Sequence, residues 1–288
     1  MHIILGGTGH IGSALARALL DQGEPVTVVT RDAENAMARD LANRGANVAA
    51  ADVLDTTALR RILHQGKRLF LLNPPAAPRA NTTVEERRTL TSILAAIDGS
   101  GLERIVAEST YGAQPGQNIG DLGVLFEMEQ ALKVQPIPAT IIRAAYYMSN
   151  WQPSIQTARE SGVVFSLYPP DFALPMVAPE DIGALAARLM MQPADQASQT
   201  GPHYIEGPRH YTANDVAAAL SAILGKPVRT EHITPDRWQA NFKELGFSEE
   251  AAESFANMTR ITLQGQFPPE GVVERGPTSL QDYLSQVK

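Results

Sequence analysis

The 288-residue sequence contains no cysteine. Without a thiol the chain can form no disulfide framework, no thiolate zinc site and no cysteine nucleophile. Its six histidines show no metal-ligand spacing such as H-x-x-x-H, so we predict no metal site. The absence of cysteine also fits a reducing compartment, and we expect a cytoplasmic protein.

Positive charge is scarce as well, since 24 lysines and arginines stand against 31 acidic residues and give a formal net charge of -7. A protein that binds nucleic acid by neutralising phosphates carries a basic surplus, so direct nucleic-acid binding is not expected. No apolar run approaches the roughly 20 residues of a membrane helix, and the apolar start breaks at Gly6-Gly7. We therefore expect no signal peptide and no membrane partner; a homodimer is favoured by general frequency alone.

The first half of the chain instead alternates short apolar runs with longer segments of helical spacing. Apart from an alanine-rich third run, these runs are apolar through their middle, as parallel strands covered on both faces require. The alternation predicts an α/β fold with a Rossmann-type, doubly wound parallel sheet. The predicted strands are His2–Leu5, Pro25–Thr30, Ala46–Ala51, Leu69–Leu72, Arg104–Ala107 and Ala139–Arg143.

Two helices of this half have clear boundaries. The segment Gly12–Gln22 places apolar residues on one face and is followed by Gly23, a natural helix end. Another helix begins near Val84, where Thr83 and Glu86 offer a capping box.

Beyond Tyr147 prolines interrupt shorter, mixed segments, which indicates a second unit. We predict a dinucleotide-binding domain over 1–147 and a smaller C-terminal α+β substrate lobe over 148–288, some of whose strands return to the first sheet. Its predicted elements are helices at Pro179–Met191 and Thr212–Leu224, a strand at His203–Ile205 and a mobile stretch from Arg237 to Gly265, where a loop could cover a ligand.

A glycine motif opens the first predicted helix. Gly6, Gly9 and Gly12 stand in the run Gly6-Gly7-Thr8-Gly9-His10-Ile11-Gly12, directly after the first strand. In this setting the first glycine permits a tight turn, the second lets a pyrophosphate approach the backbone, and the third allows close helix–sheet packing. The motif predicts dinucleotide binding; the alternative is a glycine-rich turn without a ligand.

The ends of the next strands bear on which dinucleotide is bound. Arg31 follows the second strand and favours NADP(H), whose 2′-phosphate an arginine can bind, whereas Asp32 keeps NAD(H) open. A solvated loop residue is the alternative for Arg31. Asp52-Val53 closes the third strand, beside the adenine or as a helix cap, and Asn73-Pro74-Pro75 closes the fourth at the cofactor cleft.

In this order of segments the chain resembles the NmrA-like group of atypical short-chain dehydrogenases. Beyond the glycine motif and Arg31, the resemblance rests on Arg104–Val106 leading to Ser109, Glu129–Leu132 before Ala139–Arg143, Tyr147–Asn150 and Glu180–Gly183. The group includes quinone, azo-dye and triphenylmethane-dye reductases and redox-sensing regulators. The resemblance implies that the nicotinamide lies near Ser109–Tyr111 and Ala144–Tyr147. Together with the strand ends, it gives these cofactor-binding residues: Gly6, Gly7, Thr8, Gly9, His10, Ile11, Gly12, Arg31, Asp52, Val53, Asn73, Pro74, Pro75, Ser109, Thr110 and Ala144.

One departure from ordinary short-chain dehydrogenases constrains the reaction. Their Tyr-x-x-x-Lys pair is absent, and Leu125 stands where the NmrA-like pattern often has lysine or histidine, four residues before Glu129. Because hydride transfer to a quinone leaves a stabilised anion that water can protonate, conjugated acceptors remain compatible with this chain. The candidate catalytic residues are Tyr111, Tyr146 and Tyr147, which could stack on such a ring or donate a hydrogen bond to it; the alternative role is apolar lining.

We therefore expect an NADPH-dependent oxidoreductase that transfers hydride to a quinone or a similar small conjugated aromatic acceptor. The alternative, from a different class, is a non-catalytic NADP(H)-sensing regulatory protein. A sugar-nucleotide epimerase is disfavoured because such enzymes also rely on the tyrosine–lysine pair.

Overall fold

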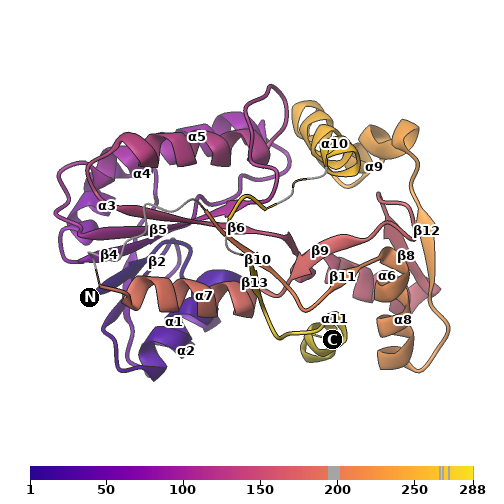
Figure 1. The fold of residues 1–288 in the computed structure, drawn as a ribbon, viewed down its shortest axis with the longest axis horizontal. Helices are drawn as coiled ribbons and strands as arrows, with labels where there is room; N and C mark the ends of the chain where they lie inside the picture. Colours follow the sequence, from indigo (N-terminus) through magenta and orange to yellow (C-terminus); the bar gives the residue numbers. More distant parts are fainter. Residues whose placement is uncertain (194–201, 266, 268, 272, 288) are drawn as a thin grey trace.

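The computed structural model describes residues 1–193, 202–265, 267, 269–271 and 273–287 (Figure 1). Its centre is an eight-stranded, wholly parallel sheet in the order β13-β10-β6-β5-β4-β1-β2-β3. The strands are β1 (His2–Ile4), β2 (Val26–Thr30), β3 (Asn47–Ala50), β4 (Arg68–Leu71), β5 (Arg104–Thr110), β6 (Ala139–Ala144), β10 (His203–Glu206) and β13 (Val273–Arg275). This confirms the predicted Rossmann-type α/β fold. The strand order reverses between β1 and β4, and ligands of such sheets bind outside the carboxyl ends of the strands at this reversal.

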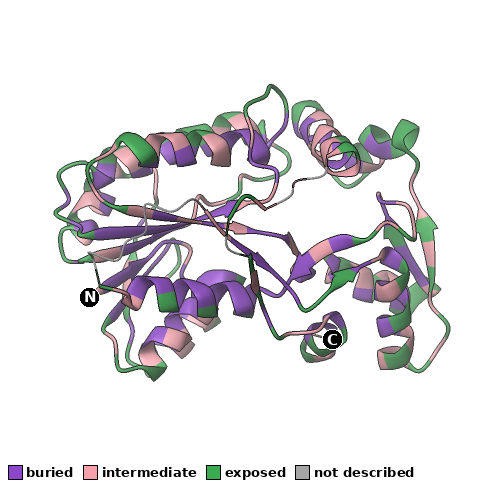
Figure 2. Cartoon of the chain, viewed as in Figure 1, coloured by how far each residue is buried: buried purple, intermediate pink, exposed green. Residues whose placement is uncertain are grey.

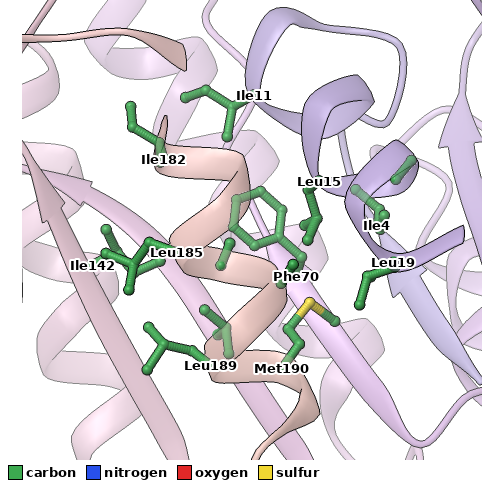
Figure 3. Close-up of a cluster of buried hydrophobic side chains, with 14 of the residues drawn as sticks. Ile4, Ile11, Leu15, Leu19, Phe70, Ile142, Ile182, Leu185, Leu189 and Met190 are labelled. Carbon is green, nitrogen blue, oxygen red and sulfur yellow. The ribbon is translucent and has the colours of Figure 1, made fainter. Parts of the chain in front are cut away.

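Helices cover both faces of the sheet (Figure 1), so that its central strands are buried (Figure 2). On one face lie α1 (His10–Asp21), α2 (Ala36–Asn43) and α7 (Pro179–Met191), and on the other α3 (Thr56–Leu63), α4 (Thr82–Ile97) and α5 (Asp121–Val134). Ile182, Leu185 and Leu189 of α7 pack with Phe70 of β4 and Leu15 of α1 in one buried cluster (Figure 3). The contact of the two helices is close, because a Cβ added to Gly183 would lie 2.8 Å from the Cβ of Ala14.

The elements outside this sandwich form a second buried cluster that includes Met148, Trp151 and Tyr211. Its strands are β7 (Tyr146–Tyr147), β9 (Leu174–Val177) and β11 (His210–Tyr211) in one sheet, and β8 (Val163–Ser166) and β12 (Arg229–His232) in another. Its helices are α6 (Pro153–Ser161), α8 (Ala213–Leu224) and α11 (Leu280–Gln286). Since α7, β10 and β13 belong to the central sandwich, the chain after residue 147 contributes to both clusters, and the predicted boundary there stays a prediction.

The stretch expected to be mobile between Arg237 and Gly265 folds into two helices, α9 (Trp238–Glu244) and α10 (Glu249–Gln264). Trp238 and Phe242 are buried against Ala252 and Ala256, and Ser248 caps α10 by accepting a hydrogen bond from the amide of Ala251. These helices bury their apolar residues mainly against each other, so the stretch has a folded structure, and its mobility stays a prediction.

The capping box predicted for Thr83 and Glu86 at the start of α4 is not formed, so this prediction was wrong. Asn81 caps the helix, accepting a hydrogen bond from the Val84 amide at 3.2 Å. Glu86 instead turns away from the helix start, and its Oε1 accepts from the amide of Ala76 at 3.0 Å. Its carboxyl group therefore belongs to the carboxyl edge of the sheet.

Among the residues that the structure describes, no helix combines the length and the apolar character needed to cross a membrane.

Candidate functional site

The glycine turn between β1 and α1 is tightly packed on its inner side, against the sheet, and open on its outer side. Gly6 has φ +64°, and a Cβ on Gly7 would lie 2.6 Å from that of Val28, while one on Gly12 would collide with the carbonyl of Gly6. Gly9 differs, because it is exposed and a Cβ there would meet only the Gly6 carbonyl oxygen, at 3.3 Å. The first and last glycines thus serve the fold, whereas Gly9 keeps the outer surface of the turn clear.

The start of α1 provides donors for an anion. Gly9 is the N-cap and offers no side chain, and the amides of His10, Ile11 and Gly12 in the first turn have no intrahelical acceptor. These N–H groups and the helix dipole place positive potential beside the open surface of Gly9. The backbone therefore fits the pyrophosphate of a dinucleotide. The Thr8 hydroxyl, 3.3 Å from that of Thr30, ties the turn to the end of β2.

Arg31 stands directly after β2 and is exposed, with no hydrogen bond or ion pair to any of the described residues. Its neighbours are engaged with one another. Asp32 Oδ1 accepts from the Glu34 amide at 2.8 Å, and the Asn35 side chain donates to Thr30 Oγ1 at 3.4 Å. Arg31 and Asp32 are the two candidates for binding the ribose or its 2′-phosphate. Among the described residues, only the side chain of Asp32 has a hydrogen-bonding partner, so Arg31 is the one that is free for a ligand.

The ends of β3 and β4 reach the same edge. Asp52 is exposed and caps a turn by accepting from the Leu54 amide at 2.9 Å, while the Val53 carbonyl accepts from the Ser92 hydroxyl at 2.6 Å. Asn73 donates to the Glu86 carbonyl at 3.1 Å and accepts from Thr89 Oγ1 at 3.0 Å. The loop of Pro74 and Pro75 is therefore anchored on α4.

Helix α10 spans two loops at this edge. The amide and hydroxyl of Ser248 donate to the carbonyls of Pro78 and Ala80, each at 2.9 Å, in the loop after β4. Asn257 donates to the carbonyl of Asn118 at 3.0 Å in the loop after β5. The helix thus bridges the loops that follow β4 and β5.

Ser109 points away from the edge, into a buried ion pair. Its hydroxyl donates to Glu129 Oε1 at 2.7 Å, and Arg143 grips both oxygens of Glu129 at 2.8 and 2.7 Å. Only the backbone of Ser109 remains for a ligand. Thr110 and Ala144, which end β5 and β6, lie side by side in register. The sequence contained both Glu129 and Arg143, but nothing in it indicated that they pair.

The three candidate tyrosines have different surroundings. The Tyr147 phenol donates to Glu108 Oε1, and the Tyr111 phenol donates to Glu206 Oε1 at 3.0 Å. Tyr146 instead lies edge-on to Tyr168 with ring centroids 5.8 Å apart, and burial raises its pKa. The structure therefore brings Tyr111 and Tyr147 to buried carboxyl groups, while the surroundings of Tyr146 fit the apolar lining role.

Two buried glutamates were missed by sequence reasoning. Glu108 is 5% exposed, and burial, with a smaller effect of the Asp121 charge, raises its pKa to about 8 against the opposing hydrogen bond of Tyr147. Burial also raises the pKa of Glu86 to about 8, helped by the charge of Asp121 and a hydrogen bond with it. Both carboxyl groups are largely neutral at physiological pH. The one available signal was an acidic residue directly after the predicted strand Arg104–Ala107.

Glu206 at the end of β10 has charged neighbours instead. Besides Tyr111, it receives Arg275 at 2.8 Å and His210 at 3.2 Å. Next to this group lies a cavity of about 240 Å³, whose lining includes Gly112, Arg143 and Tyr204. The cavity opens a place for a small molecule on this side of the edge.

A profile of the NmrA-like family matches residues 2–284. The chain is 27% identical over 287 residues to an NAD(P)H azoreductase of Xenophilus azovorans, covering 96% of this chain and 92% of that protein. It is 30% identical over 274 residues to a (4-alkanoyl-5-oxo-2,5-dihydrofuran-3-yl)methyl phosphate reductase of Streptomyces griseus, covering 93% of this chain and 82% of that protein. A crystal structure of the triphenylmethane reductase of Citrobacter sp. complexed with NADP(H) superposes with a TM-score of 0.81 at 18% identity, covering 100% of both chains.

Proposed function

Because the chain belongs to the NmrA-like family, we propose that it is an NADPH-dependent oxidoreductase that transfers hydride to a small conjugated acceptor, such as a quinone. The observation that carries this proposal is the continuity of one sheet edge. The edge leads from the open backbone of Gly9 and the free amides of α1 to the phenols of Tyr111 and Tyr147. The activities of the two relatives, an azoreductase and a dihydrofuranone phosphate reductase, support it, since both enzymes reduce conjugated groups.

Each part of the edge would hold one part of the cofactor. The amides of His10 to Gly12 would bind the pyrophosphate beside the open backbone of Gly9, Arg31 would bind the 2′-phosphate, and Asp52 with Val53 would lie on the adenine side. The backbone of Ser109, Thr110 and Ala144 would line the nicotinamide, next to the loop of Asn73 to Pro75. When bound, NADPH supplies the hydride.

The chain's own residues limit which acceptors it can reduce. Half-buried Leu125 packs against the apolar core where a lysine would activate a tyrosine, so the usual carbonyl-reducing pair is missing. An acceptor that spreads the incoming electron pair over a conjugated system needs less help from an acid. Conjugation is therefore the property of the acceptor that this site requires.

Mixing the protein with NADPH and a panel of quinones and azo dyes under anaerobic conditions tests the proposal. We expect NADPH oxidation that depends on both protein and acceptor, together with tighter binding of NADPH than of NADH by calorimetry. Tight NADPH binding without turnover of any acceptor would contradict the enzyme and favour an NADP(H)-sensing protein.

A further inference from the structure

The two phenol–carboxyl pairs at the sheet edge differ in charge. Glu206 lies 2.8 Å from the Arg275 guanidinium and 3.2 Å from the His210 imidazole. Glu108 has no cationic partner among the described residues. The carboxyl group of Glu108 therefore lacks the basic neighbours that Glu206 has.

The groups that face Glu108 all disfavour its charged form, except one. Asp121, in the first turn of α5, adds negative charge, and Asp121 in turn shares a hydrogen bond with Glu86 of α4. Burial acts in the same direction and raises the pKa of Glu108 to about 8. Only the Tyr147 phenol stabilises the carboxylate. At neutral pH Glu108 is thus mostly a carboxylic acid, and such an acid can donate its hydrogen bond to the Tyr147 oxygen, which frees the phenol proton for a ligand.

Glu108 and Tyr147 differ in how deeply they are buried. Glu108 is almost completely buried within β5, whereas Tyr147 is half-buried on β7, just beyond the carboxyl end of β6. Tyr147 packs on the same cluster as Leu72 and Tyr111, the residues that follow β4 and β5. Tyr147 is the more exposed of the two residues, although its phenol oxygen is enclosed against Glu108, so a molecule at this edge meets Tyr147 first and reaches Glu108 only through it.

Resting on the proposed function, we propose that Tyr147 protonates the reduced acceptor and that Glu108 supplies the proton through Tyr147. An azo or enone acceptor that has received a hydride carries a new N–H or C–H bond and an electron pair on nitrogen or on an enolate oxygen. That atom takes the Tyr147 proton, and the Tyr147 oxygen takes the Glu108 proton. Glu108 is left as a carboxylate that accepts a hydrogen bond from Tyr147, and water returns one proton to it. The sum is one NADPH, one proton and one acceptor converted to NADP⁺ and the reduced product.

The proposal narrows the class of acceptor. The anion left by a quinone is weakly basic and can be protonated by water, so it gains little from an internal acid. The anion left by an azo compound or an enone is strongly basic, and a positioned acid contributes about 10² to 10⁴ in rate to its protonation. Tyr147 and Glu108 therefore favour acceptors of the second kind.

Three variants test the proposal with two acceptors, a water-soluble azobenzene dye and 1,4-naphthoquinone. We expect Tyr147→Phe and Glu108→Gln to lower kcat for the dye about a hundredfold or more, and for the quinone less than about tenfold. Asp181→Asn is the control, since Asp181 is also a buried acid with a raised pKa but accepts a hydrogen bond from Thr278 and none from a phenol. It should retain kcat for both acceptors.

The pH profile separates proton supply from a merely structural role. For the wild type, kcat for the dye should fall as pH rises through about 8, where Glu108 loses its proton. This fall should be absent in Glu108→Gln and present in Asp181→Asn.

Infrared spectra of the cofactor-free protein give a readout independent of turnover. The carbonyl band of a protonated carboxyl group should disappear on raising the pH through about 8, and Glu108→Gln should lack one component of that band. A wild type that reduces the dye together with an equally active Glu108→Gln overturns the relay alone. A wild type that oxidises NADPH with neither acceptor overturns the proposed function, and the relay with it.

Discussion

The carboxyl edge of the sheet is built differently on its two sides. On the side of β1 to β3, the groups placed for a ligand are backbone amides and exposed side chains such as Arg31. On the side of β5 to β10, they are buried pairs whose members lie far apart in sequence, 39 residues for Glu108 and Tyr147 and 95 for Tyr111 and Glu206. A local segment suffices to bind a phosphate, whereas buried groups that hold a proton need partners that only the tertiary structure supplies.

The largest loss of cofactor binding is expected from a substitution that fills the open space beside Gly9, on the β1 to β3 side of the edge. We expect Gly9→Val to abolish dinucleotide binding, because its branched side chain would fill the space above the turn where the pyrophosphate approaches. Folding should survive, since a Cβ at Gly9 meets only one backbone oxygen. Calorimetric titration with NADPH and a thermal melt measure the two effects.

Gly12→Ala provides the contrast, because its Cβ would collide with the Gly6 carbonyl and should destabilise the fold itself. A folded Gly9→Val protein that binds NADPH with unchanged affinity would show that this turn is not the pyrophosphate site.

The second test asks whether Arg31, on the β1 to β3 side of the edge, binds the 2′-phosphate of NADPH. Charge-assisted hydrogen bonds contribute about 1.5 to 3 kcal/mol, so Arg31→Ala should weaken NADPH binding roughly ten- to a hundredfold and leave NADH almost unchanged. The effect should shrink in high salt because Arg31 is exposed. Arg39→Ala is the control, since Arg39 is a nearby exposed arginine that already pairs with Glu34 at 3.1 Å. Equal loss for both cofactors would make Asp32 the better candidate for the ribose.

The third test measures how the buried carboxyl groups of Glu108 and Glu86 change the free energy of unfolding with pH. A carboxyl group whose folded pKa is raised from 4.5 to about 8 gives stability that is fully present below about pH 4.5 and lost as pH rises through about 8. Glu108 and Glu86 should each add a slope of up to about 1.4 kcal/mol per pH unit in this window. Urea unfolding at several pH values should show a flatter dependence in Glu108→Gln. An unchanged slope would mean that Glu108 is charged in the folded protein.

The smallest effect is expected for tyrosine variants with a quinone acceptor. Because the reduced quinone needs no internal acid, replacing Tyr111, Tyr146 or Tyr147 singly by Phe should lower quinone turnover less than about tenfold. A hundredfold loss in any one of them, measured by NADPH oxidation, would mean that quinone reduction also needs a side-chain acid.

The fold and the β1 to β3 side of the edge could be predicted from the sequence because both depend on local patterns. The apolar runs predicted the central strands, and α7 occupies the predicted span Pro179–Met191. The β5 to β10 side could not be predicted, since burial in the folded protein raises the pKa of Glu108 and its partner Tyr147 lies 39 residues away in the sequence. The helix cap at Thr83 failed for a related reason, because Glu86 binds the amide of Ala76 in a preceding loop rather than its own helix.

The close packing of α7 on α1 also bears on how the chain is made. Strands β1, β4 and β5 leave the ribosome well before Pro179–Met191, yet Ile4, Phe70 and Val106 are covered by the cluster that α7 completes. Until that helix is synthesised, one face of the nascent sheet exposes these apolar side chains to water. The first half of the polypeptide therefore reaches its final packing only when this later segment has been synthesised.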